Sequence, residues 1–200
     1  MKIGDRIKPV IPPMEPGTYM GICIGVVDIG EQNSTFNNTS KYSDKILFVF
    51  EFPSEMIEVE GEMKPRQLSK EYTRSVDDRS SLKALISAWT GKSYTKEELL
   101  EFDVFDCIGQ ACMVTVGLSS NGLYANISNV VQFPKGFPAP STETQYYKFD
   151  MDDWKDEVFA ELPEWIQNKI KKSTQYQKLH APTDSIEVKT EPLTAGECPI

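Results

Sequence analysis

Residues 66–89 read RQLSKEYTRSVDDRSSLKALISAW, a stretch that predicts a strand followed by a helix. Its first part, Arg66–Ser75, has the composition and alternation of a β-strand. Its second part, 77–89, has apolar residues at helical spacing, namely Leu82, Leu85, Ile86 and Trp89. Gly91 predicts the end of this helix, because glycine readily takes the left-handed conformation that closes helices.

Strand patterns lie on both sides of this stretch. Two apolar, β-branched runs precede it at 17–29 and 45–52, and two follow it at 107–118 and 123–133. Asn121-Gly122 predicts a tight turn between the last two, because both residues tolerate positive φ. The order predicts an α+β, mainly β fold: a five-stranded OB-like barrel with a helix between strands 3 and 4, plus a C-terminal helical segment.

Smaller signals complete the expected organisation. Thr95 and Glu98 form a capping box that opens a second short helix, and the Asn/Ser/Thr-rich residues Gly30–Asp44 predict a loop. The expected units are an N-terminal arm (1–16), the barrel domain (17–135), a linker (136–148), a C-terminal helical segment (149–179) and a disordered tail (180–200). No membrane span or signal peptide is visible, which predicts a cytoplasmic protein.

Charge is distributed unevenly along the chain. The net charge is −9, which by itself argues against a nucleic-acid partner. Residues 64–96 nevertheless hold eight cations and only three acids. This basic segment predicts phosphate contacts from Lys64, Arg66, Lys70, Arg74 and Arg79.

The third predicted strand adds an aromatic ring to these cations. Alternation places Lys70, Tyr72 and Arg74 on one face, which suits single-stranded nucleic acid because bases stack on rings while cations meet phosphates. The alternative is that Tyr72 belongs to the core and the cations extend outward. The predicted first loop offers further candidates, Phe36, Lys41 and Tyr42.

Catalytic and metal sites are not predicted. The four cysteines form no C-x-x-C pair and His180 is the single histidine, so the usual zinc-ligand spacings are absent. No nucleophile has a neighbouring base, and no G-x-x-x-x-G-K-[ST] phosphate loop occurs. We therefore expect a protein without enzymatic activity, metal or cofactor.

The segment 66–103, with IGQACMVTV at 108–116 and NVVQFPKG at 129–136, resembles a group of bacteriophage and prophage proteins described as single-stranded-DNA-binding or replication-associated. The resemblance extends from about Gly17 to Tyr176. Its most specific part is W-x-G-[KR]-x-[FY]-[ST]-x-E-E-L, which spans Trp89 to Leu99. The resemblance implies an OB-like barrel that acts in phage DNA replication or recombination inside a bacterial host.

The C-terminus ends in Gly-Glu-Cys-Pro-Ile. Glu197, Pro199 and Ile200 resemble, in diluted form, the acidic tails through which single-stranded-DNA-binding proteins recruit replication or recombination partners. The predicted function is sequence-nonspecific binding of single-stranded DNA. The alternative is a phage accessory module that binds a host or replisome protein, for which the acidity and the C-terminal residues Trp154 and Trp165 are suited.

Overall fold

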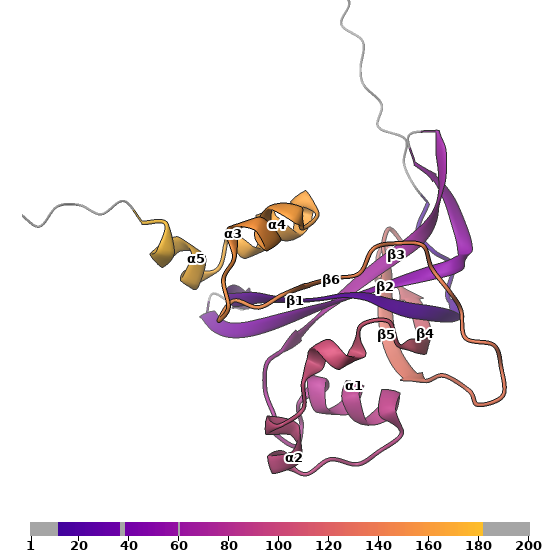
Figure 1. The fold of residues 1–200 in the computed structure, drawn as a ribbon, viewed down its shortest axis with the longest axis horizontal. Helices are drawn as coiled ribbons and strands as arrows, with labels where there is room; N and C mark the ends of the chain where they lie inside the picture. Colours follow the sequence, from indigo (N-terminus) through magenta and orange to yellow (C-terminus); the bar gives the residue numbers. More distant parts are fainter. Residues whose placement is uncertain (1–11, 37–38, 60, 182–200) are drawn as a thin grey trace, which may run out of the picture.

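The computed structural model describes residues 12–36, 39–59 and 61–181 (Figure 1). Its strands are β1 (Gly17–Phe36), β2 (Thr39–Val59), β3 (Glu62–Thr73), β4 (Ala111–Leu118), β5 (Ala125–Gln132) and β6 (Tyr147–Phe149). Its helices are α1 (Ser81–Thr90), α2 (Lys96–Leu100), the 3-10 helix η1 (Val104–Cys107), α3 (Asp156–Glu161), α4 (Glu164–Ile170) and α5 (Thr174–Leu179). None of the described helices is long and apolar enough to cross a membrane.

The strands form one sheet in the order β3-β2-β1-β4-β5, with antiparallel neighbours, and β6 pairs in parallel with β1. The predicted α+β, mainly β class is confirmed, and α1 lies between β3 and β4 in the chain as expected. β3 and β5 are the outer strands of this order. Within the described ranges no ladder joins them, so the sheet is open between these two edges.

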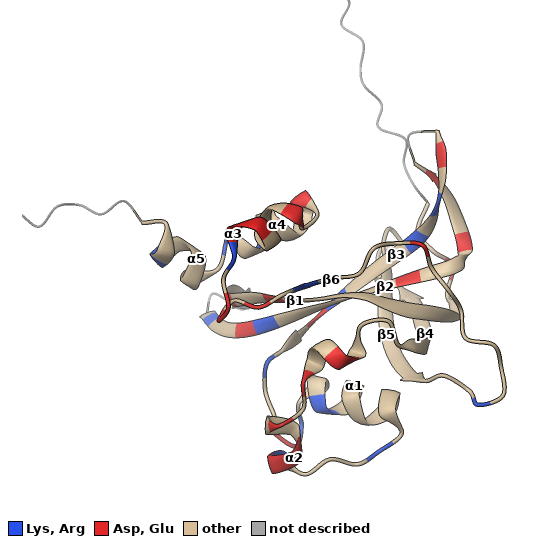
Figure 2. Cartoon of the chain, viewed as in Figure 1, with Lys and Arg blue, Asp and Glu red and all other residues tan. Residues whose placement is uncertain are grey.

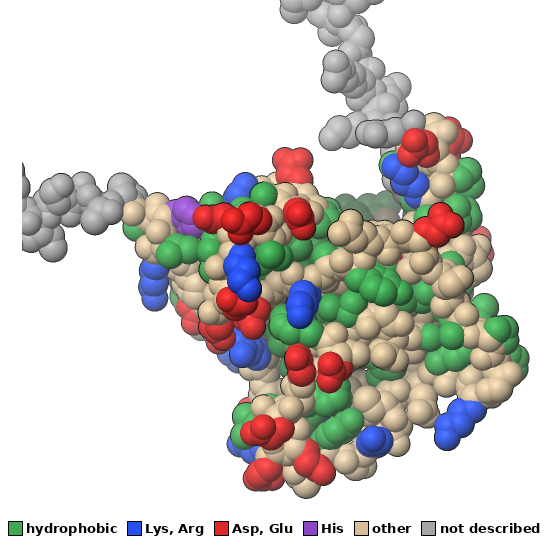
Figure 3. Space-filling model, viewed as in Figure 1, with side chains coloured by type: hydrophobic (Ala, Val, Ile, Leu, Met, Phe, Trp, Pro, Cys, Tyr) green, Lys and Arg blue, Asp and Glu red, His purple; other side chains and the backbone are tan. Residues whose placement is uncertain are grey.

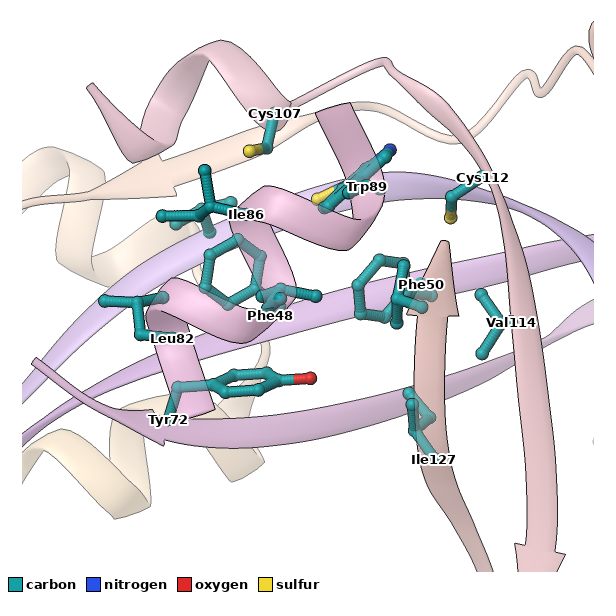
Figure 4. Packing of buried hydrophobic residues seen from close by; sticks show 14 of the residues in the cluster. Phe48, Phe50, Tyr72, Leu82, Ile86, Trp89, Cys107, Cys112, Val114 and Ile127 are labelled. Carbon is teal, nitrogen blue, oxygen red and sulfur yellow. The ribbon is translucent and has the colours of Figure 1, made fainter. Parts of the chain in front are cut away.

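Helix α1 follows the local signals closely. The Ser80 hydroxyl accepts hydrogen bonds from the backbone N–H groups of Leu82 and Lys83, and Gly91 closes the helix at φ 69°. The predicted apolar stripe is buried against the sheet, where Trp89 packs on Phe48 and Phe50 (Figure 4). This face of the sheet and α1 form the first hydrophobic core.

The predicted loop Gly30–Asp44 is wrong. Its two halves are strand, and they continue the β1–β2 pairing with Asn33 opposite Tyr42 and Ser34 opposite Lys41. Ser and Thr are compatible with extended backbone, and the ladder satisfies the backbone polar groups that a loop would expose to water. The β1–β2 hairpin therefore extends well beyond the apolar part of either strand.

A second hydrophobic core lies on the opposite face of β1 and β2. It consists of apolar residues from these strands, β6 and the C-terminal helices, namely Ile22, Ile24, Val27, Ile29, Leu47, Val49, Phe149, Leu162, Ile166 and Ile170. Figure 1 shows α3 and α4 on this side of the sheet and α1 on the other. The C-terminal helical segment is thus packed on the sheet.

The predicted linker 136–148 is also part of this packing. Tyr147 and Lys148 pair with Gly25 and Val26 of β1. A Cβ at Gly25 would lie 2.3 Å from the Tyr147 ring, so glycine is required for this close approach. The preceding residues are held by Glu51 of β2, which is fully buried and accepts hydrogen bonds from the Thr142 and Thr144 hydroxyls.

The structure describes only a small part of the predicted N-terminal arm and tail. Met14, in the predicted N-terminal arm, is 2% exposed and belongs to the first core. The predicted tail lies almost entirely in 182–200, outside the described residues.

Candidate nucleic-acid interface

The first two predicted phosphate ligands lie near the β2–β3 turn. The Lys64 Nζ atom is 2.9 Å from a carboxylate oxygen of Glu62, an exposed ion pair. The Arg66 guanidinium donates a hydrogen bond of 2.8 Å to the carbonyl oxygen of Pro12. Both cations therefore have partners within the protein.

Tyr72 is a core residue, which corrects its predicted role in base stacking. Its side chain is 3% exposed, and its ring packs edge-on against Phe48 with 5.6 Å between ring centroids (Figure 4). Burial raises the pKa of the phenol far above its usual value. The face that alternation assigned to nucleic acid points into the first core, because α1 covers it.

Lys70 shares this face but extends toward the other edge of the sheet. Its Nζ atom lies 5.3 Å from the centre of the Tyr72 ring and donates a hydrogen bond of 3.4 Å to the Ser128 carbonyl oxygen in β5. We call this place, defined by Lys70 and Ser128, the β3–β5 seam. Burial alone lowers the pKa of Lys70, and both of its contacts are uncharged.

Arg74 lies just after β3 among carboxylates. Its guanidinium is 3.1 Å from Asp28 and 3.4 Å from Asp152. Burial raises the pKa of Asp28, while the Gly30 N–H and Arg74 act in the opposite direction. The charge of Arg74 is therefore already matched, and phosphate would compete with two aspartates for it.

The remaining predicted residues of the described ranges lie on two elements, the β1–β2 hairpin and the residues before α1. Arg79 is exposed just before α1, and Lys41 and Tyr42 are exposed on the β1–β2 hairpin. Phe36 ends β1, and nothing about its side chain is described. Glu197, Pro199 and Ile200 lie outside the described residues.

The predicted cations do not gather on one surface. In Figure 2 Lys and Arg occur on separate elements with Asp and Glu between them, and on the face in Figure 3 no continuous basic patch is visible. The cations of the basic segment are thus distributed over the β2–β3 turn, the β3–β5 seam and the surroundings of Arg74.

The sequence also contains a long uncharged run, which the sequence-based prediction of the binding surface did not use. From Cys107 to Pro134 there is no Asp, Glu, Lys or Arg, although 26% of the whole chain is charged. This run includes both strands of the β4–β5 hairpin, whose turn region exposes Leu118, Leu123 and Tyr124. Tyr124 is 65% exposed, which makes it one of the most exposed aromatic side chains of the described protein.

The three cysteines that the structure describes offer no reactive site. Cys23, Cys107 and Cys112 are free and buried in the first core, in which Figure 4 labels Cys107 and Cys112. Burial, followed by Asp106 and Asp103, raises the pKa of Cys107 to about 12, and burial also raises the pKa of the other two thiols. A thiol in this condition is a poor nucleophile. Among the residues that the structure describes, no group of three or more His, Cys, Asp or Glu side chains could hold a metal ion.

Comparison with family models, curated proteins and solved structures finds no match to this chain.

Proposed function

We propose that the protein binds single-stranded DNA without sequence preference, through the β4–β5 hairpin and the β3–β5 seam of an OB-like barrel. The observation that carries this proposal is the absence of charge from Cys107 to Pro134, beside the amine of Lys70. In keeping with the resemblance in sequence, the process served is phage DNA replication or recombination.

Electrostatics favours this part of the surface. A protein of net charge −9 repels phosphate over most of its surface. The β4–β5 hairpin contributes no negative charge, and Lys70 adds a cation whose contacts are all uncharged. Phosphate therefore meets the least repulsion here, while Tyr124 and Leu123 present an exposed ring and an apolar surface for bases.

The strand order supports the OB-like barrel. In that fold five strands close with the third beside the fifth, and oligonucleotides bind at the face of strands 2 and 3 and at the 1–2 and 4–5 loops. Here Lys70 of β3 reaches across to Ser128 of β5, and α1 lies between β3 and β4. The two edges are therefore close enough for a side chain to bridge them.

One side of β2 is not free for DNA. Leu47 and Val49 belong to the second core under the C-terminal helices, and Lys169 of α4 lies 2.5 Å from Glu71 of β3. Because the C-terminal helices cover this side of the sheet, we place the proposed DNA contacts on the β1–β2 and β4–β5 hairpins. Tyr42, 52% exposed next to Lys41, supplies the ring of the β1–β2 hairpin, and Tyr124 that of the β4–β5 hairpin.

Fluorescence anisotropy with a labelled oligo(dT) tests the proposal. We expect binding that weakens as salt rises, since phosphate contacts release counterions. Tyr124→Ala is expected to weaken binding on the order of tenfold, because stacking one base contributes about 1–3 kcal/mol.

Phe137→Ala is the matched control, since Phe137 is an equally exposed aromatic residue, at 67%, outside both hairpins. Its affinity should stay within about twofold of the wild type. An oligo(dT) affinity that does not change with salt concentration, or an equal loss of affinity in the two variants, contradicts the proposal.

A further inference from the structure

A cleft of the described structure lies away from the β4–β5 hairpin. Its volume is about 770 Å³, and it is bordered by β1, β2, α2, the residues around η1 and the segment after β6. Arg74, which was predicted to contact phosphate, lies in its wall.

The rim of this cleft is acidic. Six aspartates and two cations line it, the aspartates being Asp28, Asp44, Asp77, Asp103, Asp150 and Asp152 and the cations Arg74 and Lys96. Both cations already have carboxylate partners. Arg74 pairs with Asp28 and Asp152, and the Lys96 Nζ atom lies 3.8 Å from a carboxylate oxygen of Asp77. Figure 2 shows acidic residues on α2, near η1 and after β6.

Three of these carboxylates have only uncharged hydrogen-bond donors among the described residues. Asp103 accepts a hydrogen bond from the Phe105 N–H, Asp150 from the Asp152 N–H, and Asp44 from the Gln175 side-chain amide. All of these donors are uncharged, and none of the three aspartates forms an ion pair with another described residue.

Apart from Asp28, which is buried, the inner surface of the cleft is apolar. Val26, Ile46, Leu82 and Leu99 form its buried part, and Phe102 and Met151 are half-buried. Leu100 is 66% exposed at the border, so an apolar side chain is available to an incoming ligand. An apolar surface surrounded mainly by negative charges resembles the central part and rim of a protein interface.

We propose that this cleft receives a basic segment of a partner protein, with an apolar side chain between its cations. The apolar residue packs on Leu100, Phe102 and Met151, and the cations face Asp103 and Asp150. This interaction goes beyond the proposed binding of DNA, because the negative charge of the cleft repels phosphate and attracts cationic side chains.

The charge and shape of the cleft argue against two other occupants. Nucleic acid would place phosphates against unpaired aspartates, which costs free energy. A metal ion would need a tight group of ligands, and no such group exists among the described residues. A peptide chain fits the mixture of apolar and acidic surface.

Synthetic peptides provide the probe. A fluorescent peptide with Lys and Leu at helical spacing is titrated with the full chain, alongside a peptide of equal charge in which Ser replaces Leu. We expect salt-sensitive binding of the Lys/Leu peptide and binding at least tenfold weaker of the Lys/Ser peptide. Equal binding of both peptides, equal competition by spermine, or no binding of the Lys/Leu peptide overturns the proposal.

Matched variants locate the binding. Asp103→Asn with Asp150→Asn keeps both hydrogen-bond acceptors and removes two charges from the rim, so binding of the Lys/Leu peptide should weaken on the order of tenfold. Asp106→Asn with Asp153→Asn removes the same charge outside the cleft and should change binding less than about twofold. Equal effects of the two pairs would overturn the proposal.

Two further measurements separate the cleft from the DNA-binding surface. Leu100→Ser, a change at an exposed position, should weaken the Lys/Leu peptide several-fold; unchanged affinity would contradict the role of the apolar surface. Oligo(dT) affinity of the Asp103→Asn, Asp150→Asn variant should not fall. If it falls together with peptide binding, the two surfaces are not distinct and the proposal fails.

Discussion

Lys70 and Arg74 lie four residues apart on β3 and just beyond it, and strand alternation gives them the same predicted role. Their surroundings differ. Lys70 contacts the Ser128 carbonyl and the Tyr72 ring, both uncharged, whereas Arg74 contacts Asp28 and Asp152. The difference teaches that the availability of a cation to an external phosphate is determined by neighbours that are remote in the sequence.

The same contrast divides the surface of the molecule. The β4–β5 hairpin beside Lys70 carries no charge, and the cleft around Arg74 is lined by six aspartates. One strand therefore connects the proposed DNA-binding surface with the acidic cleft.

The largest expected effect concerns Tyr72, which lies between the two cations. Tyr72→Ala should lower the free energy of unfolding by about 3–5 kcal/mol, because it removes a buried ring from the first core. Tyr72→Phe should cost less than about 1 kcal/mol and leave oligo(dT) affinity unchanged. Urea unfolding and anisotropy measure the two quantities. A stable Tyr72→Ala protein that loses DNA binding would restore the stacking role and abolish the contrast.

An intermediate effect is expected from Arg74→Ala through Asp28. Because the folded-state pKa of Asp28 is raised, its contribution to stability is largest below about pH 4 and is lost as pH rises through that pKa. Removing Arg74 raises the pKa further, so the loss becomes larger. The variant should be less stable than the wild type by about 1 kcal/mol at neutral pH, with a smaller deficit at about pH 4.

Asp28→Asn serves as the control for this pH dependence, since the amide oxygen can still accept the Gly30 N–H. In that background the deficit caused by Arg74→Ala should no longer vary with pH. A deficit that is unchanged by Asp28→Asn, measured by urea unfolding across the same pH range, would show that the pair is not the cause.

The smallest effect compares the two cations directly. Lys70→Gln keeps a donor for the Ser128 carbonyl but removes the charge, and should weaken oligo(dT) binding roughly fivefold and reduce the salt slope by about 0.7. Arg74→Gln should change the affinity less than about twofold. Equal losses would mean that both cations reach phosphate and that the two surroundings do not differ in function.

Local signals gave reliable predictions of the elements around α1. Ser80, Gly91 and the stripe from Leu82 to Trp89 act within one helix, so their effect is visible in the order of residues alone. The Thr95–Glu98 capping box of α2 and the Asn121-Gly122 turn are equally local, and both are present. The loop predicted at Gly30–Asp44 was wrong because pairing across the hairpin overrides a polar composition.

The candidate site was harder to predict, because it depends on which face each element covers. Alternation correctly placed Lys70 and Tyr72 on one face of the strand, yet could not show that α1 packs on that face and buries the ring. The lack of charge from Cys107 to Pro134 was present in the sequence and would have directed attention to the β4–β5 hairpin.

Propensity, capping and composition act over a few residues, so the order of residues was enough to predict the α+β class and the strand–helix–strand order. Three features follow from tertiary contacts instead: the C-terminal helices cover β2, Tyr72 is buried, and Arg74 contacts Asp28 and Asp152. These outcomes depend on contacts between residues far apart in the chain. The free energy of such contacts comes from burial and charge pairing that no local pattern contains.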